Sequence, residues 1–93
     1  MVNVLHINPR DNVVTALRDL PAGTLLEASD TLPAVTTREP ILFGHKVAII
    51  AIAQGGTVIK YGASIGQASA DIAPGQHVHV HNLRSVRGAA RNG

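Results

Sequence analysis

The chain has 93 residues, of which 45% are hydrophobic and 2% are aromatic, with a formal net charge of +2 at pH 7. This length predicts one domain with one modest core. The absence of Cys excludes a disulfide scaffold, thiol catalysis and Cys-held metal centres, and the few aromatic residues argue against a surface on which bases stack. No apolar run approaches the roughly 18–20 residues of a membrane span, and no signal peptide is evident, so we expect a cytoplasmic protein.

The positive charge is concentrated at the C-terminal end of the chain. Arg84, Arg87 and Arg91 lie in the last ten residues, and the preceding residues carry five Lys or Arg against six Asp or Glu. Because the body of the chain is not basic, we expect no nucleic-acid-binding face. The pattern predicts a domain over residues 1–83 and an Arg-containing tail over residues 84–93, frayed or ordered only by a partner.

The first half of the chain predicts short strands separated by turns and loops. Val2–Ile7 is predicted as a strand and Asn8–Asn12 as a turn. Val13–Leu20 is ambiguous, because its apolar residues have helical spacing whereas the β-branched residues at its start favour a strand. The polar residues 29–40, which include two Pro, predict a surface loop.

The second half of the chain continues this pattern. Val47–Ile52 is a continuous apolar run that fits a buried strand, and Thr57–Tyr61 predicts the next strand. Gln76–Leu83 alternates strictly and predicts another strand. About six short strands at roughly ten-residue spacing predict a small all-β domain.

The clearest motif is the run His77–Asn82, in which three histidines alternate with two valines. Alternate residues of a regular strand share one face, so Val78 and Val80 are predicted to enter the core. The histidines would then form a row on the other face at a spacing of about 6.6–6.8 Å. Neutral imidazole is a common ligand for zinc, iron, copper and nickel, so the row predicts metal or substrate binding. The alternative is a solvated polar face of an edge strand.

Three further pairs of adjacent polar residues are compatible with either a functional or a structural role. His45-Lys46 follows a glycine at the start of the apolar run, where it could face an anionic substrate or simply lie in a solvated turn. Lys60-Tyr61 ends a predicted strand, and on a regular strand these two side chains would point to opposite sides. Asp11-Asn12 could be a helix cap, an Asx turn or part of a polar site.

Taken in order, these motifs resemble the SAF domain at the front of the altronate and galactarate dehydratase family. The resemblance extends from about Val4 to Leu83, and its most specific segments are Val58–Gly62, Ile65-Gly66 and His77–Asn82. It implies a β-clip, which is a compact set of folded-over hairpins, and it favours a strand at Val13–Leu17.

The resemblance also implies an activity. This domain occurs either as the front of a long dehydratase or as a small subunit beside a large catalytic subunit, and the short tail after Leu83 predicts the separate form. The family reaction eliminates water from a hexonate or hexarate and gives a 2-keto-3-deoxy sugar acid, supported by a divalent metal, typically iron(II). We therefore expect a large dehydratase subunit and a sugar acid as partners, a metal site shared with that subunit, and no activity of the chain alone.

The site residues that this interpretation predicts fall into three groups. The catalytic candidates are His45, Lys46 and His79. The substrate contacts are Lys46, Lys60, Tyr61 and Asn82. The metal-ligand candidates are His77, His79 and His81, of which one or two are expected to bind the ion, because the outer two of a regular strand are about 13 Å apart.

Two other interpretations stay open at this point. The small subunit of sulfolactate sulfo-lyase is related to this family, so the leaving group could be sulfite instead of water. A non-catalytic sugar-acid binding module is the third interpretation. A Gly- and Ala-rich surface is also compatible with a homo-oligomer.

Overall fold

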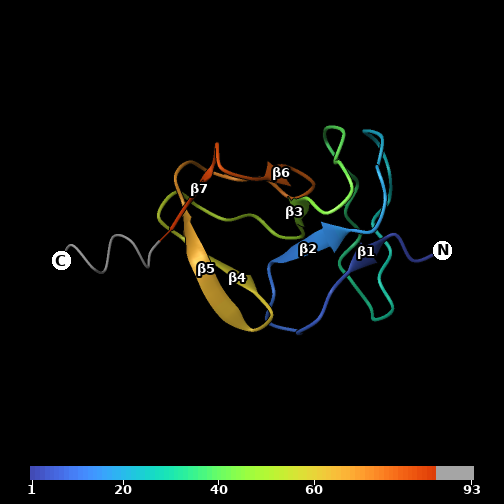
Figure 1. The fold of residues 1–93 in the computed structure, drawn as a ribbon, viewed down its shortest axis with the longest axis horizontal. Helices are drawn as coiled ribbons and strands as arrows, with labels where there is room; N and C mark the ends of the chain where they lie inside the picture. The colour runs from blue at the N-terminus through green and yellow to red at the C-terminus, as the bar shows by residue number, and fades with distance from the viewer. Residues whose placement is uncertain (86–93) are drawn as a thin grey trace.

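A computed structural model describes residues 1–85, and the strands that it contains are short and antiparallel (Figure 1). They are β1 (Val4–Leu5), β2 (Val13–Ala16), β3 (Lys46–Ala48), β4 (Thr57–Lys60), β5 (Ala63–Ala68), β6 (His77–Val78) and β7 (Leu83–Arg84). One sheet has the order β1-β2-β3-β6 and the other has the order β4-β5-β7. The described residues contain no helix, and hence none that could cross a membrane. The all-β prediction is confirmed.

Long connections fold back on themselves and extend this small framework. The segment between β2 and β3 is closed by the isolated bridges Leu20↔Ile41 and Leu25↔Thr36, and the segment after β3 is tied to the approach to β6 by Ile52↔Ile72. These folded-over connections have the form expected of a β-clip. Residues 29–40, predicted as a loop, contain no named strand but return to pair with residues of their own connection.

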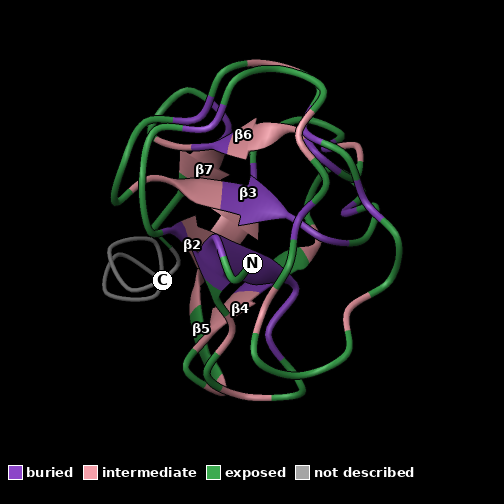
Figure 2. Ribbon diagram, turned by 90° about the vertical axis from the view of Figure 1, so that its right-hand side faces the viewer, coloured by how far each residue is buried: buried purple, intermediate pink, exposed green. Residues whose placement is uncertain are grey.

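The central strands β2 and β3 supply residues to two hydrophobic clusters, and Figure 2 shows both strands as largely buried. Val14 and Val47 belong to one cluster, while Val13 and Ala48 belong to the other. Because alternate residues point to opposite faces, both faces of this pair are covered. This explains why Val13-Val14 is continuously apolar, and β2 confirms the strand at this position against the helical spacing.

All of the predicted strands are shorter in the structure: Val2–Ile7 is reduced to β1 and Thr57–Tyr61 to β4, and two others end well before their predicted bounds. The strand predicted at Val47–Ile52 ends at Ala48, and Ile50 is 47% exposed. The strand predicted at Gln76–Leu83 ends at Val78, so Val78 is buried as expected but the prediction that Val80 enters the core is wrong, because Val80 is 82% exposed. The reason is a turn at 79–82, in which the amides of Asn82 and Leu83 both donate to the carbonyl of His79 at 3.1 and 2.9 Å.

The C-terminal end of the described chain returns to the smaller sheet. Arg84, the first residue of the predicted tail, lies in β7 and pairs with Gln67 of β5. Most of the predicted tail, including Arg87 and Arg91, lies outside the described residues.

Candidate functional site

Strand pairing brings two distant histidine segments together. β3 and β6 are antiparallel, with Lys46 opposite Val78 and Val47 opposite His77. Continued by one residue, this register sets His45 opposite His79, and Nδ1 of His45 also lies 2.8 Å from Nε2 of His77. The ring of His79 stacks on the ring of His45, with 4.5 Å between their centroids. Residues that are 32 positions apart thus share one surface.

His45, His77 and His79 form what we call the histidine cluster. Each is half-buried, and each offers a ring nitrogen such that these atoms all lie within 4.8 Å of one another. Two nitrogens bound to one ion at about 2.1 Å in tetrahedral geometry are separated by about 3.4 Å, so the cluster fits a divalent transition metal after modest side-chain rotation. A donor set made only of imidazoles suits zinc, iron, copper or nickel better than magnesium or calcium.

His81 lies at the edge of the cluster. Its ring is exposed and tilted against that of His77, with 5.4 Å between the centroids. The turn at 79–82 carries His81 out of the straight row that the alternation predicts. His45, which is predicted as a catalytic residue, lies in the donor set.

Two side chains hold the segment that carries His77 and His79. Asn82 is 3% exposed; its Oδ1 accepts from the amide of His79 at 2.9 Å, and its Nδ2 donates to the carbonyl of His77 at 2.8 Å. Glu39 accepts from the amide of His77 at 3.0 Å. Asn82 is predicted as a substrate contact, but both polar atoms of its side-chain amide bind the backbone of the segment that carries the cluster. Glu39 is absent from the sequence predictions, because it stands alone in a polar loop and carries no motif.

Electrostatics favour neutral imidazoles at His77 and His79. Burial lowers the pKa of His77, with added repulsion from His45 and His81 that outweighs the attraction of Glu39. The pKa of His79 is also lowered, first by desolvation and then by repulsion from His45. Only neutral imidazole binds a metal ion. A lowered pKa therefore keeps these side chains ready for a metal at neutral pH.

Lys46 lies beside the histidines, and Lys60 is near enough to Lys46 for their charges to repel. Burial lowers the pKa of Lys46, and the positive charge of Lys60 lowers it further. Lys46 in turn contributes to lowering the pKa of His79. The Nζ of Lys60 lies 4.7 Å from the centre of the Tyr61 ring. The prediction that these two side chains point to opposite sides assumed a regular strand, and β4 instead ends at Lys60. The surface thus combines metal-binding imidazoles with two cations and is suited to an anion.

Asp11 and Asn12 are buried and connect β4 to the loop before β2. The Oδ1 of Asn12 accepts from the amide of Ile59, and its Nδ2 donates to the carbonyl of Thr57, both at 2.8 Å. These bonds bracket the irregularity in the β4–β5 pairing between Val58 and Ile59. Neither residue caps a helix.

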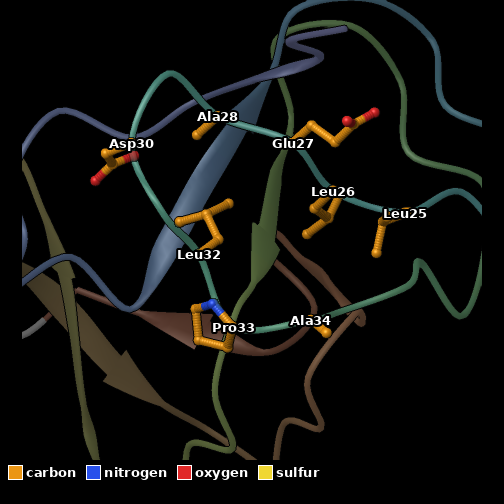
Figure 3. Close-up of a pocket in the computed structure, with 8 residues that line it drawn as sticks. All are labelled: Leu25, Leu26, Glu27, Ala28, Asp30, Leu32, Pro33 and Ala34. Atoms are coloured by element: carbon orange, nitrogen blue, oxygen red, sulfur yellow. The ribbon is translucent and has the colours of Figure 1, made fainter.

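A separate cavity of about 300 Å³ lies within the connection between β2 and β3 (Figure 3). Its lining consists of residues 25–28, 30 and 32–34, and Figure 3 shows Leu32 and Pro33 on one side of it with Leu26 across from them. None of the predicted site residues lines this cavity.

Comparison with known proteins agrees with the order of these motifs. The family model of the altronate/galactarate dehydratase SAF domain matches residues 2–86. The chain is 51% identical to an altronate dehydratase of Escherichia coli over 81 residues, which cover 87% of this chain and 16% of that protein. An altronate dehydratase of Bacillus subtilis is 39% identical over 85 residues, which cover 91% of this chain and 17% of that protein.

A second kind of relative is similar in length. A (2R)-sulfolactate sulfo-lyase subunit alpha of Chromohalobacter salexigens is 36% identical over 78 residues, which cover 80% of this chain and 83% of that subunit. The chain therefore spans about a sixth of the altronate dehydratases and most of the sulfo-lyase subunit.

Proposed function

The chain belongs to the altronate/galactarate dehydratase SAF domain family, and on this premise we propose that it acts as the small subunit of a sugar-acid dehydratase. In this proposal it supplies metal and substrate contacts to an active site that a large catalytic subunit completes. The observation that carries the proposal is the convergence of His45, His77 and His79 beside Lys46, with the charge of Lys60 near Lys46.

The histidine cluster would hold the metal, with His81 at its edge as a further imidazole. Its nitrogen donors fit a divalent ion such as iron(II), and the large subunit would supply the remaining ligands. When bound, such an ion stabilises negative charge that develops on substrate oxygens. An imidazole of the cluster that does not bind the ion is free to exchange a proton with the substrate.

The lysines would bind the carboxylate of the sugar acid. Removal of the proton from the carbon next to that carboxylate places negative charge on its oxygens, and loss of the β-hydroxyl with a proton releases water. The cationic side chains of Lys46 and Lys60 stabilise that charge, and burial of Lys46 strengthens the interaction. Tyr61 would contribute a hydroxyl at the edge of the same site. Among residues 1–85, no pair of carboxylates lies at this site, and this supports a site shared between two subunits.

The comparison in length favours a second candidate. Because the chain covers most of a sulfo-lyase subunit alpha, the same surface could serve elimination of sulfite from a sulfonated hydroxy acid. Both reactions begin with the loss of a proton next to a carboxylate, so the roles of the histidines and lysines are unchanged. The two candidates differ in the group that leaves.

Reconstitution tests the proposal. We expect the chain to be inactive alone, and to support turnover of altronate, galactarate or sulfolactate when mixed with a dehydratase-type large subunit and iron(II). His77→Ala and His79→Ala are expected to abolish this activity. His6→Gln, which removes an imidazole outside the cluster, serves as the control and is expected to retain it. Turnover by the chain alone would contradict the shared site, and binding of a sugar acid without turnover in any mixture would indicate a binding module.

A further inference from the structure

Asp11 is a buried carboxylate whose charge is held by backbone amides. It is 4% exposed, and within residues 1–85 it forms no ion pair. Its Oδ1 accepts from the amide of Gly62 at 2.7 Å, and its Oδ2 accepts from the amide of Tyr61 at 2.9 Å. The amide of Asn8 also donates to Oδ2 at 3.3 Å. A buried carboxylate needs such donors, and here two of them come from a turn 50 residues away.

That turn has a backbone that its sequence does not favour. Lys60 and Ala63 face each other across the β4–β5 hairpin, so Tyr61 and Gly62 are its two central residues. Their φ angles are 57° and 74°. A two-residue hairpin with positive φ at both positions ordinarily has Asn or Asp followed by Gly. Tyr61 is the one non-glycine residue with positive φ in the described part of the chain. A bulky side chain in this conformation is disfavoured, so the turn needs a contact that holds it.

The two carboxylate oxygens of Asp11 supply this contact. Each oxygen takes one amide of the turn, so rotation of the peptide between Tyr61 and Gly62 would break a charged hydrogen bond. Lys60 directly precedes the turn, and its Nζ lies over the Tyr61 ring. Because the Tyr61 ring contacts the ammonium group of Lys60, the backbone conformation at Tyr61 affects where that group lies, and its charge acts on Lys46.

We propose that Asp11 is a positioning residue for substrate binding, which fixes the Tyr61-Gly62 turn and thereby places Lys60 beside Lys46. This inference rests on the proposed function for the role of the lysines. Asp11 itself does not contact the substrate. The position of the Lys60 side chain can be measured in the isolated chain, without turnover.

The test is Asp11→Asn in the full chain. Asn retains one acceptor oxygen but presents an NH₂ group to the second amide, which breaks one of the two bonds. In the unmodified chain the Tyr61 ring should shift the ε-methylene proton resonances of Lys60 upfield. We expect Asp11→Asn to remove this shift and to speed hydrogen exchange at the amides of Tyr61 and Gly62. With the large subunit, KM for the sugar acid should rise roughly tenfold while kcat changes less than about twofold.

Asp71→Asn is the matched control. Asp71 accepts from the amide of Gln54 at 2.8 Å, so it also holds a turn, but at the opposite end of β4. This variant loses the same charge and is expected to leave the Lys60 resonances and KM unchanged. Gly62→Ala is the second variant, because its methyl group would strain the same turn and meet the Asn8 side chain while Asp11 stays intact. It is expected to reproduce the effect of Asp11→Asn on Lys60.

The outcomes separate the inference from the proposed function. Unchanged Lys60 resonances in folded Asp11→Asn, or in Gly62→Ala if Asp11→Asn does not fold, would overturn the inference. A fall in kcat with unchanged KM would also overturn it. If the resonances change as expected but the unmodified complex turns over no sugar acid, the positioning role is supported and the proposed function fails.

Discussion

Replacing Asn82 by alanine is expected to lower both the stability and the metal affinity of the chain. The change removes the bonds to the His79 amide at 2.9 Å and to the His77 carbonyl at 2.8 Å. Each buried hydrogen bond contributes about 1–1.5 kcal/mol, so unfolding should become easier by about 2–3 kcal/mol. Because the same bonds hold the segment that carries two ligands, affinity for a divalent metal should fall about 10–100-fold.

Asn3 offers a matched control for this prediction. It is also 3% exposed; its Nδ2 donates to the carbonyl of Leu25 at 2.9 Å, and its Oδ1 accepts from the amide of Glu27 at 2.8 Å. Asn3→Ala should therefore reduce the free energy of unfolding by the same amount, about 2–3 kcal/mol, without affecting the histidine cluster.

Urea unfolding followed by circular dichroism gives the stability of both variants, and calorimetric titration with Co²⁺ or Zn²⁺ gives their metal affinity. The reasoning requires equal losses of stability and a loss of affinity confined to Asn82→Ala. An equal loss of affinity in both variants would show that metal binding responds to stability in general. Normal affinity in Asn82→Ala would show that the amide does not position the ligands.

Two further predictions concern stability. Gly66→Ala should lower the free energy of unfolding by about 1–3 kcal/mol in thermal or urea unfolding, because a methyl group there would overlap the carbonyl oxygen of Arg84 and approach Leu83. The control, Ser64→Ala on the exposed part of β5, should change this free energy little. A neutral result for Gly66→Ala would contradict the close approach of β5 and β7. The free energy of unfolding should also decrease as the pH is lowered. The pKa of His77 in the folded chain is below the usual 6.5, so the unfolded chain binds the proton more readily. This contribution to stability is complete above pH 6.5 and is lost as the pH falls through the lowered pKa of His77. His77→Gln should therefore make urea unfolding less dependent on pH over that range. An unchanged dependence would show that His77 is not the group responsible.

Local patterns were enough to predict the fold class and most strand positions. Apolar runs of β-branched residues, interrupted by Gly and Pro turns, identify β2, β3 and β4 to within a few residues. Such patterns report which residues are buried, and burial is the main determinant of where a strand forms. The order of the motifs also predicts the family, and the match over residues 2–86 confirms it.

Local patterns gave the wrong strand length where a side chain, and not a neighbouring strand, binds the backbone. Strict alternation over 76–83 predicts one long strand, but the Asn82 amide binds the backbone of His77 and His79 and closes a turn. Alternation cannot reveal this competition, because an Asn at the end of a strand and an Asn that closes a turn have the same spacing. The burial of Val80 was mispredicted for this reason.

The sequence by itself determined which residue types are available for chemistry, and the tertiary structure decided which of them meet. His45 joins His77 only because β3 pairs with β6, and Asp11 reaches the turn at Tyr61 and Gly62 across 50 residues of chain. The His-x-His-x-His spacing favours a row of three neighbouring histidines, whereas the structure assembles its donor set from both segments. The physical reason is that strand register and buried polar bonds act between residues distant in the chain, and no local periodicity encodes them.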